Sequence, residues 1–333
     1  LKRSNFYVKA VKRSLTKTHA PAPFITSTLQ QDGSIKLGIT APQVMQIAQR
    51  LYEGVETPHG NVALITYMRT DSVRISAEAQ KDALAYIKEN YGEKYAPAKP
   101  NVYRSKKDAQ DAHEAIRPIS VKRTPESVKD FLDKNQYKLY KLIYDRFIAS
   151  QMSEAEYDSM AVAVGAEDYT LKTSGKTLVF KGYTAVYDDT KKEEDEEEGC
   201  ALLPNLSEGE PLKLVGLTKE QKFTKPPVRY TEATLIKNME DKGIGRPSTY
   251  ATVMAKLTDK KREYVRKEKK YLVPNDISYQ LVDFLVKYFP NIMNVSFTAK
   301  MENELDEIGE GGKDWHKLIA DFYVPFEKQL DES

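Results

Sequence analysis

The chain has 333 residues, of which 40% are apolar, and this is enough for about two domains with buried cores. No run of roughly 18 apolar residues is present to cross a membrane. The single cysteine, Cys200, excludes an internal disulfide and a cysteine-cluster zinc site, and the four histidines lack metal-ligand spacing. The chain starts at Leu1, without a signal peptide, which predicts a piece of a longer protein.

The charged residues are unevenly distributed along the chain. Residues 193–198 are six consecutive acids, a pattern typical of a solvated loop. Removing these six charges from the net charge of +2 leaves +8 on the rest of the chain. Basic residues are dense in 2–17, 99–107 and 260–270. This distribution is compatible with a polyanionic partner.

The spacing of apolar and turn-forming residues predicts a mixed α and β chain. The clearest helix is 42–52, whose apolar residues recur at intervals of three and four. Ser76 is expected to cap another helix. The other expected elements are a strand within 1–20, a helix starting at 26–31, a loop at 53–60, a strand at 63–68, a helix over 124–150, and strands at 160–164, 169–173 and 177–186. Core positions expected on the helices include Leu84, Ile87, Tyr91, Phe131, Leu139, Ile143 and Phe147.

The last third of the chain predicts a helix, a turn, a second helix and a hairpin in succession. A helix over 232–242 is expected to stop at Gly243, where a tight turn begins. Ser248 is expected to cap a second helix that runs to Leu257. A hairpin with a basic tip at 266–270 comes next. This order is that of a winged helix-turn-helix.

A similar order of residues occurs earlier in the chain. Thr28-Leu29, Gly38-Ile39 and Pro42 are echoed at nearly the same spacing by Thr234-Leu235, Gly243-Ile244 and Pro247. Each proline opens an amphipathic helix that leads toward a tyrosine. We interpret the echo as a structural repeat. Chance similarity is the alternative, because Gly and Pro are common in turns.

The segment 64–72 carries Tyr67, Arg69 and Asp71 at every second position. In an extended backbone these three side chains share one face. A phenol can attack a phosphodiester, and a neighbouring guanidinium can favour the phenolate or bind the phosphate. The spacing alone favours the simpler interpretation, a tyrosine on a strand beside an Arg–Asp surface pair.

A second candidate is the run His113-Glu114-Ala115-Ile116-Arg117-Pro118. His113 and Arg117 at this spacing can contact a backbone phosphate. Taken alone, the run is more often a helix-end histidine satisfied by Glu114.

Tyr67-Met68-Arg69-Thr70-Asp71-Ser72 resembles the active-site tyrosine motif of bacterial type IA DNA topoisomerases, specifically the topoisomerase I branch. Met68 supports that branch, because topoisomerase III typically has Pro and reverse gyrase commonly has His there. Four other motifs of the family agree and stand in the family's order, so the resemblance covers essentially the whole chain. They are residues 23–31, 112–118, 243–251 and 297–302.

The resemblance implies a role for each matched residue. Tyr67 would attack the DNA backbone and hold a 5′-phosphate covalently, and Arg69 would position the scissile phosphate. His113 would lie by the DNA near the tyrosine, and Arg246 with its turn would line the path of the single strand. The implied DNA-binding residues are Asp71, His113, Arg117, Arg246, Ser248 and Thr249.

The resemblance also implies an α+β multidomain gate fold with two winged-helix-like domains. A β-rich arch would comprise 1–20 and 154–182, a movable domain with Tyr67 would comprise 21–153, and a helical base would comprise 183–333. The family's Toprim domain, which binds Mg²⁺, and its zinc ribbons are expected outside this chain. Mg²⁺ is therefore implied for the full-length enzyme, with no metal ligands in this chain, no zinc and no ATP.

The implied activity is relaxation of negative supercoils by transient cleavage of one strand. The implied partners are single-stranded and negatively supercoiled DNA, without a membrane, for a monomer in the bacterial cytoplasm at the nucleoid. The chain by itself is expected to be inactive, and the alternative is an inert module that binds single-stranded DNA. A tyrosine recombinase would need several more Arg and His near Tyr67, and a metal-dependent nuclease would need a carboxylate cluster outside the acidic block.

Overall fold

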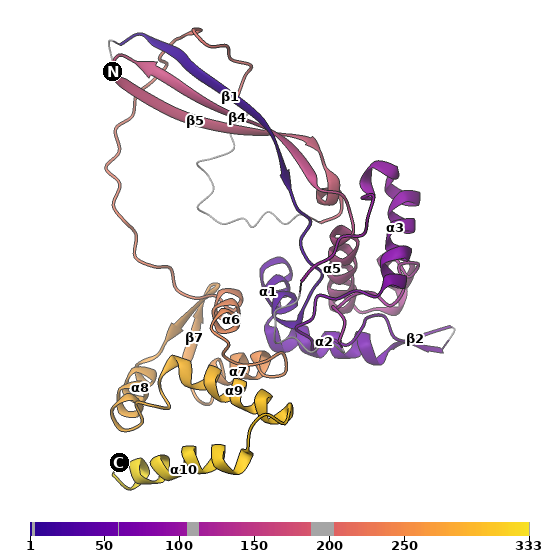
Figure 1. Cartoon of the computed structure of the whole chain (residues 1–333), viewed down its shortest axis with the longest axis vertical. Helices are drawn as coiled ribbons and strands as arrows, with labels where there is room; N and C mark the ends of the chain where they lie inside the picture. Colours follow the sequence, from indigo (N-terminus) through magenta and orange to yellow (C-terminus); the bar gives the residue numbers. More distant parts are fainter. Residues whose placement is uncertain (2–3, 59, 105–112, 188–202, 333) are drawn as a thin grey trace. The chain divides into compact units, whose positions relative to one another are not determined.

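The computed structural model describes residues 1, 4–58, 60–104, 113–187 and 203–332 (Figure 1). The acidic block at 193–198 lies outside the described residues. The chain forms two compact units, each assembled from segments far apart in the sequence. Unit 1 comprises residues 1–22, 76–102 and 145–226, and unit 2 comprises 23–75, 103–144 and 227–333.

Unit 1 contains an antiparallel sheet with the strand order β5-β4-β1-β6. The strands are β1 (Phe6–Thr18), β4 (Ala155–Ala166), β5 (Tyr169–Phe180) and β6 (Pro211–Leu212). β1 pairs with β4 along its whole length, from Phe6 opposite Ala166 to Thr18 opposite Ala155. The strands expected within 1–20, 160–164 and 169–173 are therefore confirmed. The two strands expected at 169–173 and 177–186 are one continuous strand, β5, which ends at Phe180, and a short 3₁₀ helix, η3 (Gly182–Ala185), comes after it.

β1 shows why alternation in sequence does not always persist in a strand. Phe6 and Val8 are buried, as their spacing predicts, but Ala10 is exposed. The register with β4 shifts between Val8 and Ala10, and such a bulge exchanges the faces of the residues after it. Val8 packs with Met160 and Val162 of β4 in the core of the sheet.

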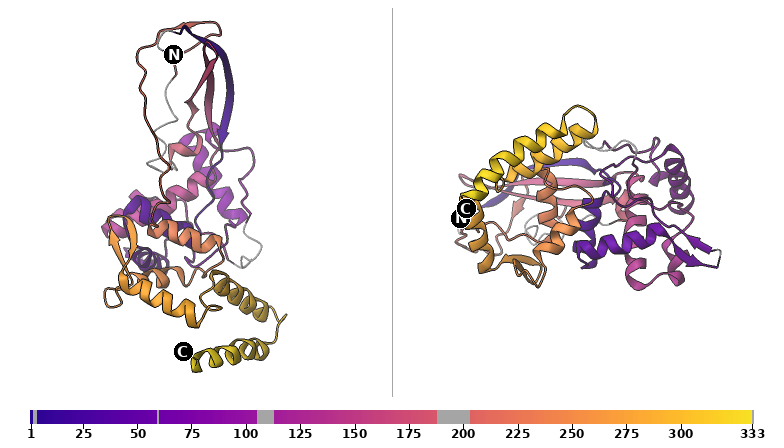
Figure 2. Two further views of the ribbon diagram at one scale, coloured as in Figure 1. Left: turned by 90° about the vertical axis from the view of Figure 1, so that its left-hand side faces the viewer. Right: turned by 90° about the horizontal axis from the view of Figure 1, so that it is seen from below.

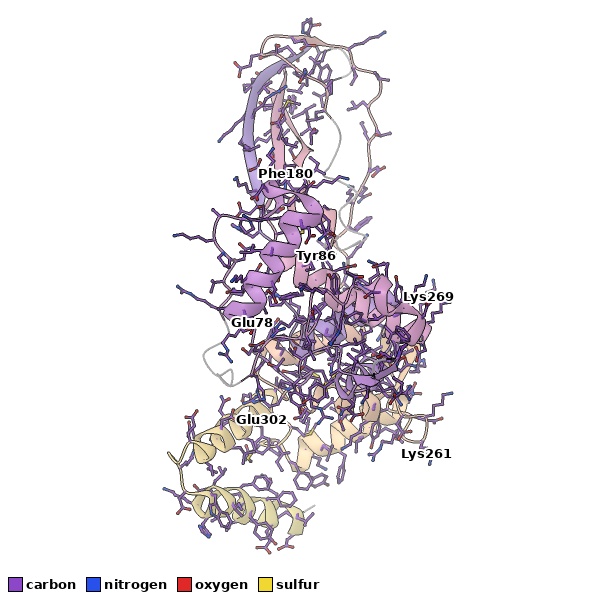
Figure 3. The ribbon with its side chains drawn as sticks, turned by 90° about the vertical axis from the view of Figure 1, so that its right-hand side faces the viewer. Glu78, Tyr86, Phe180, Lys261, Lys269 and Glu302 are labelled. Atoms are coloured by element: carbon purple, nitrogen blue, oxygen red, sulfur yellow. The ribbon has the colours of Figure 1, made fainter. Side chains whose placement is uncertain are left out.

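Helix α3 (Ala77–Tyr91) begins where the sequence predicts. The Ser76 hydroxyl accepts a hydrogen bond from the backbone N of Ala79 at 3.4 Å and caps the helix. Figure 3 shows the side chains of this helix. Its buried residues are Ala83 and Ile87, whereas Tyr91 is exposed and its ring lies 6.2 Å from that of Tyr95 in η1 (Glu93–Tyr95). The expectation that Tyr91 is a core residue is wrong.

The single helix expected over 124–150 is divided into three. The pieces are α4 (Pro125–Val128), η2 (Lys129–Phe131) and α5 (Lys134–Ser150), which crosses the boundary between the units at residue 145. The Asp133 carboxylate accepts hydrogen bonds from the backbone N of Asn135 and Gln136 and starts α5 anew. Phe131 falls at this break and is 39% exposed, so it is not a core residue. Leu139, Ile143 and Phe147 are buried, as expected.

The first part of unit 2 consists of two helices and a hairpin. They are α1 (Thr26–Leu37), α2 (Ala41–Glu53), β2 (Val55–Thr57) and β3 (Gly60–Val62). The stripe predicted for α2 is buried: Val44, Ile47, Ala48 and Leu51. The loop expected at 53–60 is wrong in part, because β2 lies within it. The strand expected at 63–68 is not formed. Its only ladder pairing among the described residues is a bridge between Ile65 and Pro118.

A second set of two helices and a hairpin begins at Glu232. It comprises α6 (Glu232–Asp241), α7 (Tyr250–Leu257), β7 (Val265–Glu268) and β8 (Tyr271–Pro274). Thr249 rather than Ser248 occupies the cap position of α7, and Ser248 is exposed. Helix α6 contacts α1, and α7 contacts α2. The two sets share a core of Ala41, Ile236, Met239, Tyr250, Met254 and Leu272. The order of elements is as predicted, and its classification as a winged helix stays a prediction.

Three further helices complete unit 2: α8 (Asp276–Tyr288), α9 (Val295–Gly309) and α10 (Trp315–Asp331). Helices α9 and α10 contact each other and run side by side (Figure 2). Among the described residues, no helix has both the length and the apolar character to cross a membrane.

Candidate active site around Tyr67

Tyr67 lies at the surface of unit 2, and two aromatic rings lie close to its own ring. Its side chain is 38% exposed. The ring of Tyr52, from the last turn of α2, meets it edge to face, with 5.3 Å between ring centroids and 66° between planes. The ring of His113 lies 5.8 Å away at 30°. The structure therefore brings together two candidates that are 46 positions apart in the sequence.

The segment after Tyr67 alternates between surface and interior. Tyr67 and Arg69 are exposed and Asp71 is half-buried, whereas Met68, Thr70 and Ser72 are buried. The expected shared face is present, although the backbone bends at residues 66, 68 and 69 instead of forming a sheet strand. The alternation of burial is therefore present without a strand partner for residues 67–72.

A threonine on α1 holds this segment in place. The Thr26 hydroxyl donates to the Met68 carbonyl at 2.7 Å and accepts from the Thr70 backbone N at 2.9 Å. The Thr26 backbone N donates to the Thr70 carbonyl at 2.9 Å. The backbone on both sides of Arg69 is thus fixed to the first turn of α1, where Thr26 is fully buried.

A second threonine ties the same segment to the His113 run. The Thr66 hydroxyl donates to the Ala115 carbonyl at 2.7 Å and accepts from the Arg117 backbone N at 3.0 Å. The Thr66 backbone N donates to the Arg117 carbonyl at 3.0 Å. These bonds keep His113 beside Tyr67. Thr26 stands in the motif at 23–31, but the sequence pattern does not reveal the bonding partners of either threonine.

The two arginines near Tyr67 differ in their surroundings. Within the described part of the chain, Arg69 is exposed and forms no hydrogen bond or ion pair. Arg117 is largely buried, and its guanidinium donates to the Glu114 carboxylate at 2.7 and 2.9 Å and to the Pro118 carbonyl at 3.0 Å. Arg69 is available to bind an anion, whereas Arg117 is already engaged by the protein. The DNA-binding role expected for Arg117 stays a prediction.

Arg246 is held in the turn between α6 and α7. Its guanidinium donates to the Asp306 carboxylate of α9 at 2.7 Å and to the Gly245 carbonyl at 3.1 Å, and Glu302 lies 3.9 Å away. Burial opposes the charged form. The hydrogen bond and charge of Asp306, with the charge of Glu302, outweigh it and raise the pKa of Arg246. The guanidinium therefore stays charged and oriented.

The backbone of this turn is fixed by Thr249. The Thr249 hydroxyl accepts from the Arg246 backbone N at 2.8 Å and donates to the Arg246 carbonyl at 3.1 Å. The next residue, Tyr250, is buried, and burial first, then the charges of Glu240, Asp71 and Glu302, raise its pKa to about 12 against the opposing charge of Arg246. The charge of Asp71, from the Tyr67 segment, thus acts on Tyr250, which lies in the second helix pair, α6 and α7.

The buried carboxylate of Glu232 links the first helix pair, α1 and α2, to the second, α6 and α7. The sequence pattern does not reveal this link. Glu232, at the start of α6, is 5% exposed. Its carboxylate accepts a hydrogen bond from the backbone N of Ala41, at the start of α2, at 3.0 Å. It also forms an ion pair with Lys267 of β7. A negative charge at a helix N-terminus is stabilised by the exposed N–H groups and the helix dipole.

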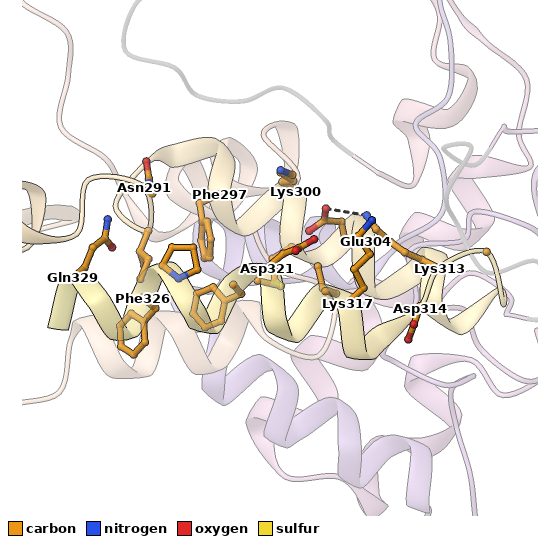
Figure 4. Close-up of a pocket in the computed structure, with 16 residues that line it drawn as sticks. Asn291, Phe297, Lys300, Glu304, Lys313, Asp314, Lys317, Asp321, Phe326 and Gln329 are labelled. Carbon is orange, nitrogen blue, oxygen red and sulfur yellow. Dashed lines mark hydrogen bonds and ion pairs between the residues drawn. The ribbon is translucent and has the colours of Figure 1, made fainter. Parts of the chain in front are cut away.

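A cavity of unit 2 lies away from these residues. It has a volume of about 510 Å³ and is formed by α9, α10 and the segments beside them (Figure 4). Phe297, Phe322 and Phe326 line it, and its charged side chains include both lysines and acids. Neither Tyr67 nor Arg246 lines this cavity.

Clusters of metal-ligating side chains are absent from the described residues. No group of three or more His, Cys, Asp or Glu side chains is close enough to hold an ion in the part of the chain that the structure describes. The Mg²⁺ implied for the full-length enzyme stays a prediction.

Comparisons with known proteins define the class to which this site belongs. A family model described as DNA topoisomerase matches residues 1–320, so the chain belongs to the DNA topoisomerase family. The chain is 44% identical to DNA topoisomerase 1 of Rickettsia felis, covering 99% of this chain and 43% of that protein. It is also 44% identical to DNA topoisomerase 1 of Campylobacter jejuni, covering 99% of this chain and 46% of that protein.

The fold is also that of a solved topoisomerase I. The full-length topoisomerase I of Thermotoga maritima superposes with a TM-score of 0.84 at 40% identity, covering 98% of this chain and 52% of that one. The chain thus spans about half the length of the relatives that it matches. The resemblance to bacterial topoisomerase I predicted from the motifs is confirmed.

Proposed function

We propose that Tyr67 is the nucleophile of a type IA topoisomerase reaction that cuts and rejoins one DNA strand. The observation that carries this proposal is the exposed Tyr67 phenol beside an unengaged Arg69, within a chain that belongs to the DNA topoisomerase family. Both side chains lie on the exposed face of a segment whose backbone is fixed by Thr26 and Thr66.

The proposed step is a transesterification. The Tyr67 Oη forms a bond to phosphorus, the bond from phosphorus to O3′ breaks, the phenol loses its proton, and O3′ gains one. The products are a 5′-phosphotyrosyl end and a free 3′-hydroxyl. Arg69 would neutralise charge on the non-bridging oxygens, an effect typically worth about 10²–10³ in rate. Rejoining is the reverse step, so no ATP is needed.

We propose that strand passage through this break relaxes negatively supercoiled DNA. Because the chain spans less than half of its curated relatives, we place Mg²⁺ binding and full activity with sequence that those relatives have in addition. The matched motifs support this division, because they include the tyrosine but no acid cluster among the described residues.

The experiment is covalent trapping. A 3′-labelled single-stranded oligonucleotide is incubated with the chain and Mg²⁺, alone and with the N-terminal region of a full-length relative, and resolved on a denaturing gel. We expect a shifted band only with the added region and its loss in Tyr67→Phe. Tyr91→Phe is the matched control, since Tyr91 is 37% exposed and lies in unit 1. A band that survives Tyr67→Phe contradicts the proposal.

The second candidate function is single-strand binding without chemistry. The excess of basic over acidic residues outside the acidic block and the exposed aromatic side chains favour it. In this case the logarithm of the affinity for an oligonucleotide should fall steeply with the logarithm of the salt concentration. A flat salt response excludes this candidate.

A further inference from the structure

The Tyr67 ring is oriented by its aromatic neighbours. Among the described residues, its hydroxyl has no hydrogen-bond partner, and 38% of the side chain faces solvent. Contacts on the ring itself therefore determine which rotamer is populated. Tyr52 supplies an edge-to-face contact at 5.3 Å, and His113 lies on the ring at 5.8 Å. Edge-to-face pairs at this separation are favourable because the positive edge of one ring meets the negative face of the other.

The position of Tyr52 is fixed by the helix that carries it. Leu51, the preceding residue, is fully buried at the end of the α2 stripe. The Leu51 carbonyl accepts a hydrogen bond from the backbone N of Leu64 at 2.9 Å, and Leu64 is also buried. This bond brings the chain back to α2 three residues before Tyr67. Two rings 15 positions apart are thereby held in contact by a rigid backbone.

We propose that Tyr52 is a positioning residue that orients the Tyr67 phenol before DNA binds. This inference rests on the proposed function of Tyr67 as the nucleophile. The Tyr52 ring restricts the Tyr67 ring through its edge-to-face contact, and the His113 ring is a second neighbour. A nucleophile that is already oriented does not lose rotational freedom when the phosphate arrives, and this raises the rate of attack.

The Tyr52 ring, and not its hydroxyl, carries this effect. Aromatic pairs shift a conformational equilibrium by roughly two- to tenfold. Tyr52→Leu should therefore slow adduct formation by about three- to tenfold at saturating oligonucleotide. Tyr52→Phe keeps the ring and should restore the rate. Neither variant should alter oligonucleotide affinity.

The kinetic test uses the trapping assay reconstituted with the added N-terminal region, under single-turnover conditions. Tyr91→Leu, which removes a tyrosine of nearly the same exposure from a ring pair in unit 1, is the matched control and should keep the wild-type rate. Affinity is measured in a Tyr67→Phe background, where no adduct forms. If Tyr52→Leu lowers this affinity by the same factor as the rate, the Tyr52 ring binds DNA and the proposal is overturned.

A second measurement does not depend on adduct formation. The chain is labelled with 3-fluorotyrosine, and the ¹⁹F resonance of Tyr67 is assigned by its loss in Tyr67→Phe. We expect this resonance to move toward that of a solvent-exposed fluorotyrosine in Tyr52→Leu and to stay in Tyr52→Phe. An unchanged resonance in Tyr52→Leu overturns the positioning role. If the wild type forms no adduct but the resonance moves as expected, the proposed function fails while the ring contact holds.

Discussion

The two helix pairs of unit 2 share one plan and carry different groups. Each has a helix, a glycine turn, a second helix and a two-stranded hairpin. The turn glycines have nearly the same backbone conformation, with φ of +68° at Gly38 and +69° at Gly243. In each first helix a threonine at the third position caps the backbone, Thr28 in α1 and Thr234 in α6. The repeat expected from the sequence thus has a structural counterpart.

The pairs differ in where the candidate residue stands relative to the turn. The first turn is closed by Thr40 and Gln43, and its reactive candidate, Tyr67, comes only after the hairpin. The second turn itself contains the candidate, Arg246, which α9 holds through Asp306. One scaffold can therefore present a nucleophile beyond its hairpin or a cation within its turn. Similar backbones do not imply similar chemistry.

The strongest test of this difference between the pairs replaces Tyr67 and Arg246 in separate variants. We expect Tyr67→Phe to abolish the covalent adduct and to leave oligonucleotide affinity unchanged. We expect Arg246→Ala to weaken affinity about tenfold and to reduce the slope of log affinity against log salt by about 0.7. Fluorescence anisotropy at several salt concentrations measures both, and Arg246→Lys controls for charge. Equal losses of affinity in Tyr67→Phe and Arg246→Ala would show that the two pairs share one task.

Removing the Glu232 carboxylate, which links the two helix pairs, is expected to have the next largest effect, on the free energy of unfolding. Glu232→Ala leaves the Ala41 N–H and Lys267 without their acceptor in a largely buried position. We expect a loss of about 2–3 kcal/mol in the free energy of unfolding, measured with urea. Glu232→Gln keeps an acceptor for Ala41 and should lose less. If both variants are as stable as the wild type, the pairs do not depend on this contact.

Tyr250 predicts a dependence of stability on pH. Its pKa of about 12 in the folded chain exceeds the ordinary value of 10, so the folded state keeps its proton longer than the unfolded state. The stabilisation is complete below pH 10 and is lost as the pH rises from 10 to 12. Between pH 10 and pH 12 the free energy of unfolding, measured with urea, should fall by about 1–2 kcal/mol less in Tyr250→Phe than in the wild type. An identical decline in the variant would show that the side chain is not responsible.

The smallest predicted effects compare the two turns directly. An added Cβ at Gly38 meets no atom within 4 Å, and at Gly243 it meets only Ala299 Cβ at 3.5 Å. Gly38→Ala and Gly243→Ala should therefore each cost about 1 kcal/mol, from left-handed backbone strain alone. Gly33→Ala should cost more, since its Cβ would lie 2.5 Å from Val44 Cγ2. Clearly unequal costs at Gly38 and Gly243 would argue against equivalent turns.

The spacing of apolar residues correctly predicted the elements that bury a single continuous face along their length. The stripe of α2 and the stop of α6 at Gly243 are confirmed, because burial along a helix repeats with its turn. Periodicity failed where a local contact outweighed it. The bulge after Val8 exposed Ala10, and the Asp133 cap divided a helix and exposed Phe131.

The candidate site was predictable in the members that stand in motifs around Tyr67 and His113. Tyr67 and His113 stand in motifs, and the structure brings their rings together. Thr26, Thr66 and Glu232 act through backbone atoms far along the chain. Their partners depend on how the helices pack, and a single sequence does not contain that information. The same is true of residues 63–68. The sequence predicted a strand there, but the hydrogen-bond partners of this segment are not strands.

The hydrogen bond between Leu51 and Leu64 makes the intervening hairpin a closed detour. The chain leaves α2 and returns to it before the reactive segment begins, and that segment is then anchored by Thr26 and Thr66 rather than by β2 or β3. The length of the hairpin therefore does not determine the position of Tyr67. Because these anchors lie outside the hairpin, we expect residues added or removed at its tip to leave the backbone position of Tyr67 unchanged.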